Sequence, residues 1–241
     1  MALNGRRHLL IAFIALLLAA GAARGQDEPP QTTQLWFDYD PTWLLSKRWT
    51  LDVDIATRAI ISGQPLWQIR LQPTLQFSPW KWMDLTGGVW VIYSRQAEAF
   101  DRFETRPTVG IRHKVDIWRG VRLSNYFRVE LRIQRNLDTS QTLTARRLRN
   151  RIQVMAPINH RSLSQDNTWH IFADAEFFRQ RDPNVDDGFN SRQRYRAGIG
   201  WRKDSARTYQ FFYGFERSRN LINEPFSSDN IFSFSLIQTF K

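Results

Sequence analysis

Three short stretches of this 241-residue sequence place charged residues, eight of the nine arginine, at every second position. They are Arg128-x-Glu130-x-Arg132, Arg147-x-Arg149-x-Arg151 and Arg192-x-Arg194-x-Arg196. Because successive side chains of a β-strand point to opposite faces, each stretch would line up its charges on one face of one strand. Guanidinium groups in such rows can pair bidentately with carboxylates or bind phosphate groups. The chemistry to expect is therefore ion pairing or anion binding.

Carboxylates on the same predicted face could pair with these arginines. The predicted network comprises Arg128, Glu130, Arg132, Arg147, Arg149, Arg151, Asp174, Glu176, Arg192, Arg194 and Arg196. We favour cross-strand ion pairs that fill a narrow interior, since small β-barrels are mostly filled by their own side chains. The alternative is an anion-selective lumen, or a site for a phosphorylated or carboxylated ligand, because arginine exceeds acid on this face.

The segments that carry these residues alternate apolar and polar residues with a period of two. Predicted strands span 48–60, 67–77, 83–94, 103–116, 121–134, 146–156, 167–178, 190–201, 207–217 and 229–240, with a further piece at 34–44. A tilted membrane-crossing strand needs about 9–11 residues, whereas globular strands typically have about 5–6. The pattern predicts an all-β fold, a transmembrane antiparallel up-and-down β-barrel of ten to twelve strands.

Two features do not fit a regular ten-stranded barrel. Pro73 lies inside a predicted strand and lacks a ladder donor, so we expect a bulge or a local break there. The piece at 34–44 would be an eleventh element. We expect it to lie in the lumen or at a rim, unless residues 26–33 help to form a twelfth strand.

Seven of the ten tryptophans lie at or beside alternate connections between the predicted strands. They are Trp43, Trp49, Trp80, Trp82, Trp118, Trp169 and Trp201. An indole ring favours a lipid–water boundary because it is apolar and carries one N–H donor. These residues therefore predict an aromatic girdle at the periplasmic interface, with the other set of connections extracellular.

The N-terminus predicts export. Arg6 and Arg7 precede a short apolar run, and Ala23-Arg24-Gly25 provides a small-x-small cleavage site. The run is too short to span a membrane as a helix. We expect a removed signal peptide at 1–25, a short segment at 26–33 and the barrel at 34–241. The predicted location is the outer membrane of a Gram-negative bacterium.

Composition and charge narrow the possible functions. The absence of cysteine excludes disulfides, thiolate metal sites and a cysteine nucleophile. A net charge of +11 would suit nucleic acid. However, the arginines lie opposite an apolar face and no nucleic-acid motif is present, so we expect no nucleic-acid partner. No ligand spacing for a metal occurs, and no cofactor is expected. The expected partners of this monomer are outer-membrane lipid, lipopolysaccharide and the barrel-assembly machinery.

An outer-membrane enzyme acting on lipid is the alternative function. Beyond the leader the histidines are His113, His160 and His170, which parity places toward lipid, in a turn and inward, respectively. His170 has Asp174 four residues on, but it lies at the periplasmic end of its strand, far from the outer leaflet. Because a general base must reach its substrate, we predict no catalytic residues. The preferred role is structural or passive transport, of which an anion-favouring pore is one form.

Several short motifs resemble a known family. They are Gln34-x-Trp36, Trp49-x-Leu51, Arg128-x-Glu130-x-Arg132, Arg147-Leu148-Arg149-x-Arg151 and Arg192-x-Arg194-Tyr195-Arg196. Over about 34–241 the chain is similar to a bacterial family of uncharacterised outer-membrane β-barrels, classified only as a domain of unknown function. The resemblance implies a barrel, but it implies no activity and supplies no catalytic residues.

Overall fold

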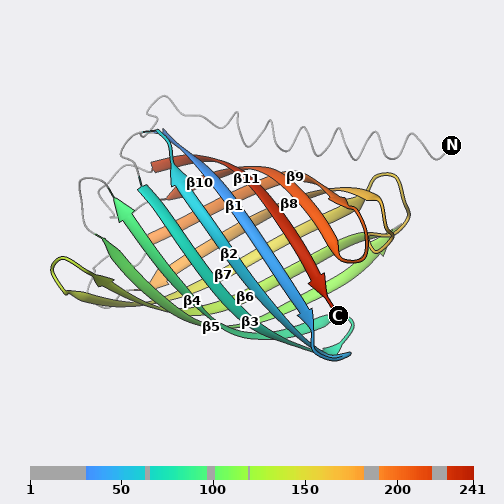
Figure 1. Cartoon of the computed structure of the whole chain (residues 1–241), viewed down its shortest axis with the longest axis horizontal. Helices are drawn as coiled ribbons and strands as arrows, with labels where there is room; N and C mark the ends of the chain where they lie inside the picture. The colour runs from blue at the N-terminus through green and yellow to red at the C-terminus, as the bar shows by residue number, and fades with distance from the viewer. Residues whose placement is uncertain (1–30, 63–65, 97–100, 119, 182–189, 219–226) are drawn as a thin grey trace. The chain divides into compact units, whose positions relative to one another are not determined.

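The computed structural model describes residues 31–62, 66–96, 101–118, 120–181, 190–218 and 227–241. The predicted signal peptide lies outside the described residues. The described part forms one sheet of eleven strands that closes on itself (Figure 1). The strands are β1 (Gln31–Leu44), β2 (Trp49–Ile60), β3 (Leu66–Trp80), β4 (Met83–Gln96), β5 (Arg102–Trp118), β6 (Val121–Asn136), β7 (Thr142–Pro157), β8 (Thr168–Arg181), β9 (Asn190–Arg202), β10 (Arg207–Ser218) and β11 (Ser227–Phe240). None of the described residues belongs to a helix long and apolar enough to cross a membrane.

The barrel closes through a parallel seam between its first and last strands. All consecutive strands pair antiparallel, whereas β1 and β11 pair in parallel from Gln31–Ser228 to Trp43–Phe240. With an odd number of strands, the first and the last run in the same direction and can only pair this way. The predicted strand number and barrel are confirmed. The expectation for 34–44 is wrong, because this segment is a wall strand whose pairing leaves no sheet edge open.

Prolines interrupt three of the ladders without shifting them. At Pro73 two consecutive residue pairs between β3 and β4 are missing, and the register is the same on either side. Pro41 and Pro107 have the same effect on the β1–β2 and β5–β6 ladders. A proline has no amide hydrogen to donate, so the neighbouring strand loses a partner there. The predicted local break at Pro73 is confirmed, and no bulge accompanies it.

The connections gather at two rims, as the strand pattern predicts. At the C-terminal rim, where β1 and β11 end, the described connecting residues are 45–48, 81–82, 120, 158–167 and 203–206. At the N-terminal rim they are 61–62, 101 and 137–141. Both register shifts within the ladders, near Phe77–Trp80 and Asp116–Trp118, lie close to the C-terminal rim.

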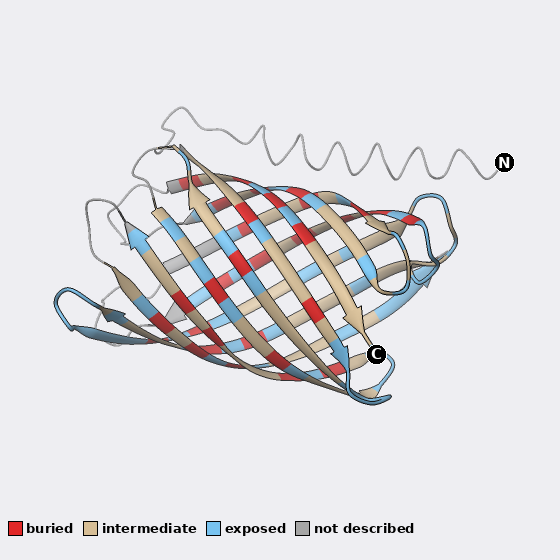
Figure 2. Ribbon diagram, in the orientation of Figure 1, coloured by how far each residue is buried: buried red, intermediate tan, exposed pale blue. Residues whose placement is uncertain are grey.

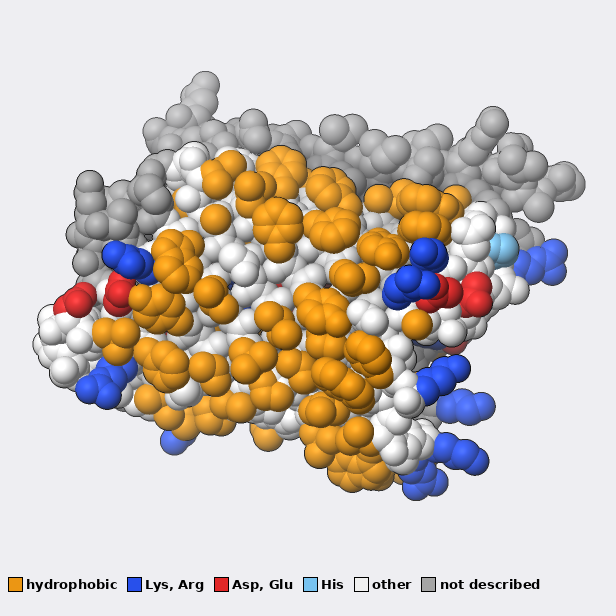
Figure 3. All heavy atoms as spheres, viewed as in Figure 1, with side chains coloured by type: hydrophobic (Ala, Val, Ile, Leu, Met, Phe, Trp, Pro, Cys, Tyr) orange, Lys and Arg blue, Asp and Glu red, His pale blue; other side chains and the backbone are white. Residues whose placement is uncertain are grey.

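The barrel is apolar outside and polar inside. Along β3 the side chains of Ile69 and Leu71 are exposed, whereas Arg70 between them is buried, and the same alternation runs along the other strands (Figure 2). Of the buried described residues, ten are hydrophobic and nineteen are polar or charged. Figure 3 shows hydrophobic side chains over the middle of the visible face and charged ones toward its ends. This distribution is the reverse of that of a water-soluble protein.

Candidate functional site: the interior ion-pair network and its cavity

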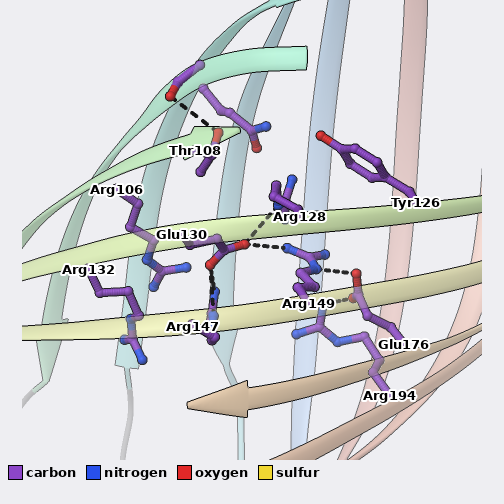
Figure 4. A network of polar contacts seen from close by, with 12 residues as sticks. Arg106, Thr108, Tyr126, Arg128, Glu130, Arg132, Arg147, Arg149, Glu176 and Arg194 are labelled. Atoms are coloured by element: carbon purple, nitrogen blue, oxygen red, sulfur yellow. Dashed lines mark hydrogen bonds and ion pairs between the residues drawn. The ribbon is translucent and has the colours of Figure 1, made fainter. Parts of the chain in front are cut away.

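Glu130 lies at the centre of the interior network (Figure 4). The β6–β7 register places it directly opposite Arg147. Arg147 Nε donates to Glu130 Oε2 at 2.8 Å, and Arg128 Nε donates to Oε1 at 2.9 Å. A guanidinium nitrogen of Arg149 lies 3.6 Å from the same carboxylate. This one carboxylate, which has no solvent exposure, thus lies close to three guanidinium groups.

The network continues from Glu130 across the neighbouring strands. Arg149 also donates to Glu176 on β8, which accepts from Arg194 on β9 at 3.2 Å. Arg194 Nε in turn donates to Glu216 on β10 at 2.6 Å. Since each acid is held by arginines of adjacent strands, β6 to β10 are linked by continuous, charge-assisted hydrogen bonds.

Two further groups of ion pairs surround this network. On the side of the N-terminal rim, Glu104 accepts from Arg106 Nη2 at 2.9 Å and from Arg132 Nε at 2.7 Å. Across the barrel, Arg70 binds Asp54 through Nε at 3.0 Å and through Nη2 at 2.7 Å. These bonds satisfy charges that would be costly to bury unpaired.

Aromatic rings face the interior among the arginines. The guanidinium carbons of four arginines lie within 5.5 Å of the Trp90 ring centroid, from Arg70, Arg106, Arg128 and Arg149. Arg58 lies 3.7 Å from the centroid of Trp36. Such cation–π contacts strengthen when they are shielded from water. The sequence analysis missed both rings, although their position within the alternation of β4 and β1 places them on the interior face.

The central side chains of the network are buried. Glu130, Glu176 and Trp90 have exposed fractions of 0%, 1% and 4%. At this level side chains occupy much of the interior, as in other small barrels.

A cavity of about 430 Å³ lies between the network and the C-terminal rim. Two opposed groups of charged residues contribute to its lining. The acidic wall consists of Asp38, Asp40, Asp52 and Asp54, on β1 and β2. The arginine wall consists of Arg128, Arg149, Arg151, Arg194 and Arg196, on β6, β7 and β9. No three His, Asp or Glu side chains of the described residues are arranged to hold a metal ion.

The structure brings most of the predicted network residues together. Arg132 lies apart from Glu130 and pairs with Glu104, while Asp174 pairs with Arg196 at 2.9 Å. Arg151 lines the cavity and takes part in no ion pair with the part of the chain that the structure describes. The side chain of Arg192 lies outside the described residues. Asp38 and Asp40 of β1 were not predicted on the interior face, because the sequence left open whether that segment was a wall strand.

The seven predicted girdle tryptophans lie on the outer face near the C-terminal rim. Neighbouring rings stack: Trp80 on Trp82 of the following connection at a centroid distance of 5.3 Å, and Trp169 of β8 on Trp201 of β9 at 5.8 Å. Near the seam Trp43 stacks on Phe240 at 5.4 Å. Trp49 and Trp118 are exposed at the same rim. The parallel seam thus places both ends of the barrel wall in one aromatic band.

The three histidines of the described residues lie in three different environments. His170 is buried and faces Gln210, with 3.3 Å between its Nε2 and the amide nitrogen. Its ring also lies near Phe172 rather than in a hydrogen bond to Asp174. His113 stacks on Trp82 on the outer face, and His160 lies in a connection at the C-terminal rim.

Comparison with known proteins gives one match. A family model described as "Protein of unknown function (DUF2490)" matches residues 33–222. The matched segment includes every residue of the central network and both walls of the cavity. No curated protein and no solved structure matches the chain.

Proposed function

The chain belongs to the DUF2490 family of proteins of unknown function, and from this premise we propose that it is a bacterial outer-membrane β-barrel with a closed interior and a structural role. The function rests on the geometry alone, since the family description assigns no activity. The observation that carries the proposal is the reversed distribution of polarity between the two faces of the wall.

The outer face suits hydrocarbon. Val109, at the middle of β5, is 62% exposed, and Phe37 and Phe211 are more than half exposed. In water such a continuous apolar surface would promote aggregation. In a bilayer this surface would contact acyl chains. Closure of the sheet gives every wall strand a hydrogen-bonding neighbour on both sides, as a membrane-spanning backbone requires. The strands have 12 to 17 residues, enough to cross the hydrocarbon at a tilt.

The tryptophans support one orientation of the barrel. Indole rings at the C-terminal rim would lie at one lipid–water boundary. In the orientation that we propose, this rim faces the periplasm and the N-terminal rim faces outward. The predicted signal peptide would direct the chain to this location.

The filled interior favours a structural role over free diffusion. An open pore would need a hydrated path between the arginine rows, whereas their guanidinium groups are bonded to buried carboxylates. An anion-favouring pore is therefore the less supported form of the function. No described contact favours an enzyme acting on lipid.

Cell fractionation and bilayer recordings test this proposal. We expect the protein in the outer-membrane fraction, with a heat-dependent shift in detergent-gel migration that is typical of intact barrels. Reconstituted in planar bilayers, it should show no stable conductance. Folding and solubility without detergent would contradict the membrane location, and a steady anion-selective current would contradict the closed interior.

A further inference from the structure

The cavity contains charged groups that the other described residues leave unpaired. Asp40 and Arg151 line opposite sides of it, and neither takes part in a hydrogen bond or an ion pair among the described residues. Asp52 accepts one hydrogen bond, from the Thr42 hydroxyl at 2.8 Å. Arg128 Nη2 is buried without a partner, although the same side chain donates to Glu130 through Nε. Buried polar groups without partners are rare and mark positions where a ligand can bind.

The order of strands places these unpaired charges across the barrel from each other. Asp40 and Asp52 lie on β1 and β2, and Arg128 and Arg151 lie on β6 and β7. In a ring of eleven strands, these two pairs of strands are on opposite sides. The other acids of the acidic wall share one guanidinium group, because Arg70 pairs with Asp54 and lies 3.4 Å from Asp38. Asp40 and Asp52, which take part in no ion pair among the described residues, therefore face Arg151 and Arg128 Nη2 across the cavity.

We propose that this cavity binds a small zwitterion with its opposite charges at opposite ends. Its ammonium group would pair with Asp40 and Asp52, and its carboxylate or phosphate would pair with Arg151 and Arg128 Nη2. The volume of about 430 Å³ lies within the range of about 300–1,000 Å³ of known small-molecule sites. The buried N–H of Trp90, which lines the cavity without a hydrogen-bond partner, is a further donor for the anionic end.

A ligand with a single charge would fit less well. A simple anion would satisfy the arginines but would leave Asp40 and Asp52 unpaired and would be repelled by them. A simple cation would pair with the aspartates but would leave Arg151 unpaired and would be repelled by it. A ligand with one charge pairs with one side of the cavity and leaves the charge on the other side unpaired, which costs most of the free energy that the pairing gains. The arrangement therefore favours a ligand that carries both charges. This inference concerns the inside of the barrel and does not depend on its location in a membrane.

Calorimetric titration of the detergent-folded protein tests the ligand class. The probes are 4-aminobutyrate, which carries a carboxylate, and phosphoethanolamine, which carries a phosphate. The controls are butyrate, butylamine, inorganic phosphate and ethylamine. We expect at least one zwitterion to bind about tenfold or more tightly than either of its halves, and the better probe identifies the anionic group. Absence of binding by both zwitterions, or equal binding by a half, would overturn the proposal.

Two substitutions assign the two ends. Arg151→Gln should weaken the binding of the better zwitterion about tenfold or more and should not weaken the binding of its amine half. Asp40→Asn should weaken the binding of the same zwitterion by a similar factor and should not weaken the binding of its anionic half. The matched control is Arg122→Gln, whose exposed side chain pairs with Asp116 at the C-terminal rim. Zwitterion affinity that is unchanged in both cavity variants would refute the assignment. A variant without the heat-dependent gel shift is not folded. In that case the comparison of zwitterions with their halves on the wild-type protein still decides the proposal.

Discussion

Glu130 on β6 and Arg147 on β7 are direct cross-strand partners that are both buried at the centre of the barrel. Their bond joins two adjacent strands, and Arg128 and Arg149 approach the same carboxylate. Such a pair contributes little net stability over apolar packing, but its disruption leaves buried charges without compensation.

Glu130→Ala should lower the free energy of unfolding by about 3–5 kcal/mol. The substitution leaves three guanidinium groups near the centre of the barrel with one carboxylate fewer. Urea unfolding of the protein in lipid vesicles, followed by tryptophan fluorescence, measures this loss. Asp116→Ala is the control, because Asp116 pairs with Arg122 on the exposed rim and should contribute about 0–1 kcal/mol. Equal unfolding midpoints for Glu130→Ala and wild type would mean that water reaches the network.

Trp90→Ala should destabilise the protein by about 3–5 kcal/mol, the usual cost of truncating a large buried ring. The substitution also removes a ring that four guanidinium groups share. Trp80→Ala is the comparison, since its ring is 55% exposed on the outer face and should cost less. Unfolding in the same vesicles gives both values. A larger loss for Trp80→Ala would show that the girdle, and not the interior ring, dominates stability.

Gly198→Ala should destabilise by about 1–3 kcal/mol through overpacking. A Cβ at this position would lie 2.2 Å from the backbone oxygen of Phe211, which the β9–β10 ladder holds in place. Gly87→Ala is the matched control within a strand, because a Cβ there meets nothing within 4 Å. It should be neutral or stabilise slightly, since alanine restricts the unfolded chain. Similar thermal midpoints for the two variants would contradict this difference in packing.

Val109→Arg should cost about 2–4 kcal/mol if the middle of the outer face contacts hydrocarbon. Leu143→Arg, near the N-terminal rim at the start of β7, should cost about 0–1 kcal/mol, because depth in the bilayer sets the penalty. Both side chains are exposed, so on a water-facing surface neither substitution should have a large effect. Refolding into vesicles measures both. Equal, small losses would exclude hydrocarbon around Val109.

Alternation of polarity was the most informative signal in the sequence. It predicted the strands, the two rims and the interior position of residues such as Glu130 and Arg147. A period of two assigns each side chain to one face of the strand, and this assignment does not depend on where the strand begins. It also separated the rim tryptophans from the apolar middle of the wall. Trp36 and Trp90 could have been assigned to the interior by the same rule, but their type suggested the outer face.

Pairing across the barrel could not be predicted in the same way. Periodicity gives the face of a side chain but neither its depth nor its neighbour, because depth depends on the stagger of all eleven strands. Arg132, Arg147 and Arg151 all belong to the interior face of their strands. Nevertheless, Arg132 pairs with Glu104, while Arg151 lies beside the cavity with no ion pair among the described residues.

By itself the sequence determined which residues face inward, where the chain turns and that the interior would be rich in arginine, since these properties follow from local alternation. Only the tertiary structure decided that β1 belongs to the wall, because its ladder with β11 joins segments at opposite ends of the chain. Closure of that seam also placed the carboxylates of β1 and β2 across from the arginines of β6 and β7. The cavity between them depends on the circumference of the ring, a property of all the strands together and of no single segment.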